Sequence, residues 1–191
     1  MACFPLQDSR HSVVSDENMS SSQDNYEIRL ATVTIGHRDE FLQTLRTVGK
    51  RNTTSIICFD AEKMAGPDHV ETAIQHAQRS FFSEKPISNS FEMEALLFAA
   101  GSRQCSAATL FGIHSGVNIL FVCICPPKDK VWAELTPHMH FVADIGDTWT
   151  KEKATRLMKL FDISQNEVDL VGEDRLKELV LERIALLKVY R

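Results

Sequence analysis

The sequence contains no run of apolar residues long enough to cross a membrane. The longest such run, Val117 to Cys125, is interrupted by Asn118, whereas a spanning helix needs about 20 consecutive apolar residues. The N-terminal segment Met1–Leu6 is too short for the apolar core of a signal peptide, and a polar stretch follows it. These absences predict a soluble cytoplasmic protein without membrane contact, and for a eukaryotic chain a nuclear location stays open.

The sequence also lacks the cysteine pattern of a disulfide-stabilised domain. It has 5 cysteines, and three of them, Cys58, Cys123 and Cys125, lie inside apolar runs. Disulfide frameworks normally use an even number of cysteines in an oxidising compartment. A chain of 191 residues can bury a core without such cross-links. We therefore interpret Cys123 and Cys125 as small buried apolar residues rather than as a redox pair.

Local catalytic motifs are absent as well. The 8 glycines are scattered, and no glycine-rich phosphate loop, nucleophile elbow or carboxylate pair is present. His138 and His140 share one side of an extended segment near Asp144, but no third ligand follows at a recognisable spacing. His69 and His76 are interpreted as surface residues of one helix. We predict no catalytic residue, metal or cofactor, and keep a small-molecule enzyme using His138 and His140 as the weaker alternative.

The first 25 residues form a polar and acidic segment. Serines alternate there with Asp8, Asp16, Glu17 and Asp24, and the lack of apolar periodicity is typical of a disordered tail. Against a single Arg10, these acids give the segment −3 of the net charge of −5. Residues 26–191 therefore carry only about −2, so that nucleic-acid binding would require a local basic patch.

Residues 26–191 alternate between strand and helix patterns. Strands are predicted at Tyr26–Ile35, Ser55–Phe59 and Val117–Cys125, with a further edge strand over Met139–Ile145. The Val117–Cys125 segment is continuously apolar, as expected at the centre of a sheet that is covered on both faces. The order of elements predicts a single α/β domain in which several helices pack against a small mixed β-sheet.

The stretch between residues 85 and 112 carries several signals for helix ends. Asn89 and Glu92 have the spacing of a capping box. An apolar helix follows and ends at Gly101, and Ser102 then begins a second short helix. The N-termini of both predicted helices therefore fall within this one short stretch of the sequence.

Helix N-termini attract phosphate groups through free backbone N–H groups and the helix dipole. Lys85, Asn89 and Arg103 lie beside the two predicted N-termini, and Phe91 and Phe111 offer rings on which unpaired bases stack. Each residue also has a simpler structural interpretation. Asn89 is then only a helix cap, Arg103 a solvated side chain or a carbonyl ligand, and Phe111 a core residue.

The C-terminal helix, predicted from about Glu173 to Val189, is more apolar than one core-facing stripe requires. This surplus indicates that part of the helix meets a partner. The predicted partner face consists of Leu176, Val180, Ile184 and Leu187. The alternative is a helix that is buried completely within its own domain.

The motifs Ser88–Glu92, Gly101–Gln104 and Phe111–Ile113, with the apolar strand that follows, resemble a known family. This family is the small kinase-binding subunit of the KEOPS complex, called EKC in eukaryotes (the PRPK-binding protein family). The resemblance covers residues 26–191 in the order of elements, and its specific residues lie within residues 85–125. Cys105 replaces a usually aliphatic residue, and the acidic tail has no counterpart.

The resemblance implies a non-catalytic protein that binds and regulates the small atypical kinase/ATPase of the complex and meets the other KEOPS subunits indirectly. The assembly attaches threonylcarbamoyl to the adenosine beside the tRNA anticodon, and archaeal and fungal members hold the 3′ CCA end of tRNA. Such an end would bind at Lys85, Asn89, Arg103 and Phe111. A kinase-binding scaffold without RNA contact is the alternative that the negative net charge favours.

Overall fold

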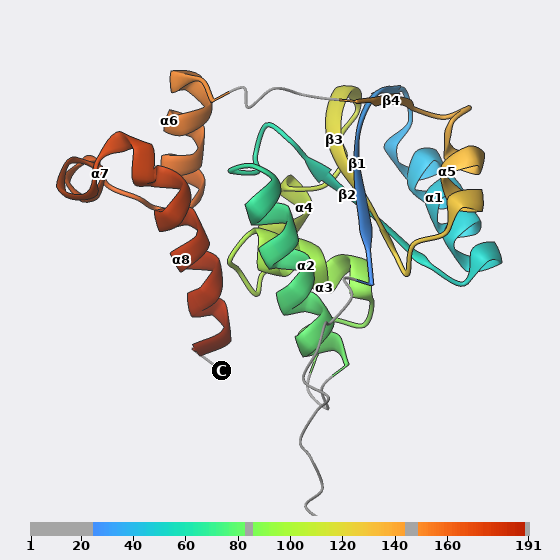
Figure 1. Cartoon of the computed structure of the whole chain (residues 1–191), viewed down its shortest axis with the longest axis horizontal. Helices are drawn as coiled ribbons and strands as arrows, with labels where there is room; N and C mark the ends of the chain where they lie inside the picture. Colours follow the sequence, from blue (N-terminus) through green and yellow to red (C-terminus); the bar gives the residue numbers. More distant parts are fainter. Residues whose placement is uncertain (1–24, 83–85, 144–148, 190–191) are drawn as a thin grey trace, which may run out of the picture.

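The computed structural model describes residues 25–82, 86–143 and 149–189, and Figure 1 shows their arrangement. The predicted tail lies outside these residues, apart from Asn25. The elements in chain order are β1 (Glu27–Ile35), α1 (Arg38–Asn52), β2 (Ser55–Asp60), α2 (Pro67–Phe81), α3 (Phe91–Ala99), α4 (Cys105–Leu110), β3 (Gly116–Cys125), α5 (Asp129–Leu135), β4 (His140–Val142), α6 (Lys151–Leu160), α7 (Gln165–Val171), the 3₁₀ helix η1 (Glu173–Arg175) and α8 (Leu176–Val189). The predicted α/β class is confirmed.

The described strands form one sheet in the order β2–β3–β1–β4. β3 pairs antiparallel with β1 and with β2, and β1 pairs antiparallel with the short edge strand β4. The sheet is therefore antiparallel throughout, and the prediction of mixed pairing is corrected. α1 carries the chain from β1 to the far side of β3, so β1 and β2 run in the same direction without being neighbours. A strand–helix–strand pattern alone does not distinguish this arrangement from adjacent parallel strands.

The two faces of the sheet bury different side chains of β3. α1 and α5 cover one face, where Leu120, Val122 and Ile124 lie in the core. α2, α3 and α4 cover the other face, where Cys123 and Cys125 are buried. Both cysteines are unpaired, and burial raises the pKa of both thiols. They are buried apolar residues, as predicted. Because both faces of β3 are covered by helices, the strand lacks an apolar–polar alternation.

The C-terminal helices form a further layer outside α2 and α3 (Figure 1). α8 packs against α2, α3 and α6 and buries its apolar side in the same core as α2 and α3. Arg183 of α8 forms an ion pair with Glu167 of α7. The hydrogen bond from the Ser164 amide and the contact with Arg183 lower the pKa of Glu167, which keeps this link charged near neutral pH.

The structure corrects the surface interpretation of His69 on α2. The Ala65 amide donates to His69 Nδ1 over 3.0 Å, and Nε2 lies 2.9 Å from the carbonyl oxygen of Ala99. Both contacts are satisfied by a neutral ring that carries its proton on Nε2. The side chain is 1% exposed, and burial lowers its pKa to about 4. His76 is half-buried and stacks on Phe98.

We expect the free energy of unfolding to fall as the pH drops from about 6.5 towards 4. Across this interval His69 is protonated in the unfolded chain but stays neutral in the folded chain. The difference between 6.5 and about 4 corresponds to roughly 3 kcal/mol in total. Urea unfolding at pH 7 and at pH 5 measures the loss.

His69→Gln removes the titrating group and should flatten this part of the pH dependence. His138→Ala, at an exposed position, serves as the control and should leave it unchanged. The same acid-induced loss of stability in His69→Gln and in the wild type would show that another group is responsible.

Candidate functional site

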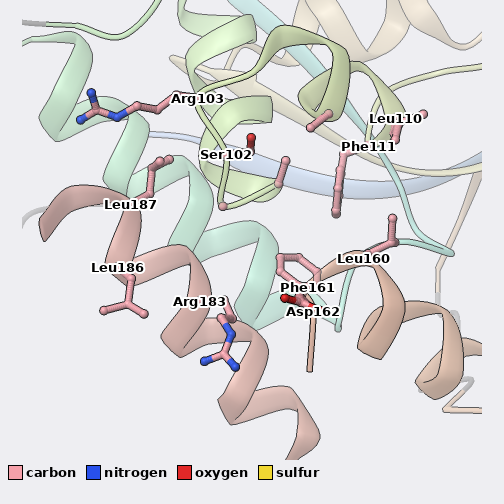
Figure 2. Close-up of a pocket in the computed structure, with 13 residues that line it drawn as sticks. Ser102, Arg103, Leu110, Phe111, Leu160, Phe161, Asp162, Arg183, Leu186 and Leu187 are labelled. Carbon is pink, nitrogen blue, oxygen red and sulfur yellow. The ribbon is translucent and has the colours of Figure 1, made fainter. Parts of the chain in front are cut away.

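A pocket of about 480 Å³ lies where the turn between α3 and α4 meets α8 and the end of α6 (Figure 2). Its lining is mostly apolar and comes from three separate stretches of chain, residues 100–111, 160–162 and 183–187. Leu110 lines the pocket, and 54% of its surface is exposed. An exposed large apolar side chain next to a hollow is a common feature of binding sites.

Gly101 lies where the chain turns after α3, next to α8. Its φ of +56° is a conformation that residues with a Cβ rarely adopt. A Cβ at this position would lie 3.5 Å from the carbonyl oxygen of Arg183, an ordinary van der Waals distance, so the positive φ is the feature that favours glycine. The predicted helix end at Gly101 is therefore confirmed, and the turn at this glycine lies next to Arg183 in the lining of the pocket.

Phe111 forms part of the pocket lining but belongs to the core. It is 2% exposed, and its ring lies edge-on to Phe161 with 5.6 Å between the ring centroids. Its carbonyl oxygen accepts a hydrogen bond from the Asp60 amide over 2.8 Å. The ring faces are thus occupied by packing, so the predicted role of Phe111 as an open stacking platform is not supported by its burial.

Arg103 is the cation at this pocket that is available to a ligand. Arg183, the other basic residue in the lining, is engaged with Glu167. Arg103 is exposed and forms no hydrogen bond or ion pair with any residue in the described ranges. In Figure 2 its side chain points away from Phe111, towards the side on which Leu187 lies.

The predicted capping box at Asn89 and Glu92 is wrong. The N-cap of α3 is Ser90, whose hydroxyl accepts a hydrogen bond from the Met93 amide over 3.2 Å. Asn89 is exposed and precedes the cap. Serine and asparagine are nearly equivalent as caps, so the residue types did not decide between adjacent positions.

A buried carboxylate fixes the chain before α3. Glu94 is fully buried and accepts hydrogen bonds from the amides of Ile87, over 3.0 Å, and of Ser88, over 2.7 Å. A capping-box carboxylate would instead accept from the amide of the N-cap residue itself, here Ser90. Of the four residues predicted to hold RNA, Arg103 and Phe111 come together in the pocket lining, whereas Asn89 is outside the lining. Lys85 lies outside the described residues.

The predicted partner face of α8 points into the core. Leu176, Val180, Ile184 and Leu187 are all buried and pack with α2 and α3. These side chains therefore hold α8 on the domain, and only Leu187 also reaches the pocket, which corrects their interpretation as an exposed partner face. The apolar surplus arises because neighbours contact α8 on more than one side.

His138 and His140 are both exposed, on either side of the buried Met139. Asp144, their proposed neighbour, lies outside the described residues. Within the described ranges, no three His, Cys, Asp or Glu side chains gather closely enough to hold a metal ion. None of the helices in these ranges combines the length and apolar character of a membrane span.

The fold and the pocket define a small α/β binding domain, and comparison with known families identifies it further. The family described as kinase binding protein CGI-121 matches residues 37–188. The chain therefore belongs to the CGI-121 family of kinase-binding, non-catalytic proteins, which is the KEOPS subunit family that its motifs resemble. No curated protein matches the sequence.

We expect Ile184→Asp to lower the free energy of unfolding by at least about 3 kcal/mol, because it places a carboxylate in an apolar core. Leu186→Asp, on the same helix but only half-buried at the pocket, should cost about 1 kcal/mol. Urea unfolding of both variants measures the difference. Wild-type stability of Ile184→Asp would show that this face of α8 is not part of the core.

Proposed function

We propose that this protein is the non-catalytic subunit of a KEOPS (EKC) complex that regulates its small atypical kinase/ATPase and holds the 3′ CCA end of tRNA. Family membership supports the kinase contact. The RNA contact is supported by one observation, the unengaged Arg103 guanidinium beside a mostly apolar pocket. The other KEOPS subunits are then met indirectly, through the kinase.

The chemistry of a single-stranded RNA end fits such a pocket. Its unpaired bases present flat apolar faces, and its phosphates accept hydrogen bonds from a guanidinium in a fixed planar geometry. Leu110 and Leu186 supply apolar surface on opposite walls, and Arg103 supplies the charge. Arg103 is the one cation without an ion pair among the described lining residues, so few phosphates are neutralised and contacts with the bases must supply much of the affinity.

The four buried residues of α8 act indirectly in this proposal. By packing against α2 and α3, they hold in place the helix that supplies Arg183, Leu186 and Leu187 to the pocket. The exposed surface that contacts the kinase therefore lies outside these four residues in this proposal.

We expect removal of the terminal CCA to weaken tRNA binding about tenfold or more, since the trimmed end loses the apolar contacts of its bases with Leu110 and Leu186 and its phosphate contact with Arg103. Arg103→Glu should weaken binding of intact tRNA to the same extent and should have little further effect on the trimmed transcript. Filter binding at two salt concentrations measures both affinities. Because Arg103 and the predicted Lys85 are the few cations of this site, we expect a shallow salt slope of about −1 to −2.

Arg46→Glu is the matched control, because it makes the same charge change on α1, on the opposite face of the sheet. It should leave the discrimination between intact and trimmed tRNA unchanged. Equal affinity for the two transcripts in the wild type would reject the 3′-end site. The kinase-binding scaffold without RNA contact would then be the function that remains.

We expect the purified chain alone to hydrolyse no ATP and to transfer no threonylcarbamoyl group, and a small kinase to co-purify with it from a native lysate. Steady-state assays and mass spectrometry of the purified material test these two points. Turnover that survives further purification and is abolished by His138→Ala would instead support the small-molecule enzyme.

A further inference from the structure

The pocket at Arg103 has a second cation in its lining, Arg183 of α8. Figure 2 shows the two guanidinium groups at separate places around the pocket, Arg103 at the upper left of the view and Arg183 near its lower edge. The side chain of Arg183 extends away from Phe111. Because each nucleotide carries its own phosphate, two cations that lie apart can contact different phosphates of one RNA strand.

A carboxylate outside the pocket holds the charged end of Arg183. The guanidinium donates from Nη2 to Oε1 of Glu167 on α7, and Glu167 is not among the described lining residues. The Arg183 and Glu167 side chains keep 29% and 36% of their surface exposed. An ion pair that is this accessible to water contributes little net free energy, so a competing anion can replace the carboxylate.

The position of Glu167 does not depend on Arg183. Its other oxygen, Oε2, accepts hydrogen bonds from the Ser164 amide over 2.8 Å and from the Ser164 hydroxyl over 3.0 Å. These contacts form the capping box at the start of α7. The carboxylate therefore stays in place when the arginine leaves it.

Arg183, in contrast, is suited to a change of partner. Its long side chain rotates about several bonds, and its planar group of five N–H donors matches a phosphate as well as a carboxylate. The backbone of Arg183 lies against Gly101 in the pocket wall. A rotation of the side chain alone is then enough to exchange Glu167 for a group bound in the pocket.

We propose that Arg183 is a second phosphate-binding residue of this pocket, and that Glu167 competes with the RNA 3′ end for it. This inference rests on the proposed function of the pocket. In the free protein the guanidinium is paired with Glu167, and on binding it exchanges this carboxylate for a phosphate oxygen. One ion pair replaces another, so Arg183 adds little affinity while Glu167 is present. Glu167 thereby limits how tightly the RNA end is held and favours its release.

Glu167→Gln tests this competition in the full chain, because glutamine also completes a capping box but carries no charge. We expect the variant to bind intact tRNA about two- to fivefold more tightly than the wild type, which is the contribution of an exposed ion pair. Its salt slope should become steeper by about 0.7, since one more phosphate is neutralised. Binding of CCA-trimmed tRNA should not change. Filter binding at two salt concentrations measures all of these affinities.

Glu178→Gln is the matched control. It makes the same charge change on α8, in an ion pair with Arg175, and neither of these residues is among the described lining residues. It should leave the affinity for intact tRNA unchanged. An equal gain in Glu178→Gln and in Glu167→Gln would overturn the proposal, because the effect would then come from net charge.

Arg183→Gln separates competition for the arginine from direct repulsion of the RNA by Glu167. Combined with Glu167→Gln, it should abolish the gain and return the affinity to that of Arg183→Gln alone. A gain that persists in the double variant would overturn the proposal, since Glu167 would then act without Arg183.

The wild type shows whether a failure concerns this competition or the proposed function itself. A wild type that prefers intact tRNA, with no gain in Glu167→Gln, would overturn this inference alone. Equal affinity of the wild type for intact and trimmed tRNA would overturn the proposed 3′-end site and this inference with it.

Discussion

The structure depends on the burial of β3 on both of its faces. Each face of this strand lies in a separate apolar core, one beneath α1 and α5 and the other beneath α2, α3 and α4. β3 also supplies the hydrogen-bond ladder to both β1 and β2. The helices on both faces of the sheet, including α3 and α4 beside the pocket, are therefore positioned by one strand.

The sequence predicted those elements whose apolar spacing is regular. The edge strand near Met139, the central position of Val117–Cys125 and the helix end at Gly101 followed from local patterns and are present. The direction of strand pairing was not predictable in this way, because α1 takes the chain over an intervening strand. Local periodicity records which side of a segment is apolar, but not what covers it.

The same limit explains the errors at single residues. His69 looked like a surface residue because its two partners, the Ala65 amide and the Ala99 carbonyl, belong to the backbone and leave no side-chain signal. The apolar excess of α8 was interpreted as a partner face, but the side chains assigned to that face pack in the core of the same domain. For the candidate site, Arg103 was identified from its place beside a helix start, whereas its neighbours on α8 come from 80 residues further along the chain.

The position of α8 gives the pocket a thermodynamic consequence. One wall consists of α8 residues, so the pocket exists only while the C-terminal layer is docked on α2 and α3. A ligand that binds this pocket must then favour the docked over the undocked state by mass action. Docking of α8 and occupancy of the pocket are therefore linked equilibria, and a change that loosens the helix far from the pocket lowers ligand affinity without touching the ligand.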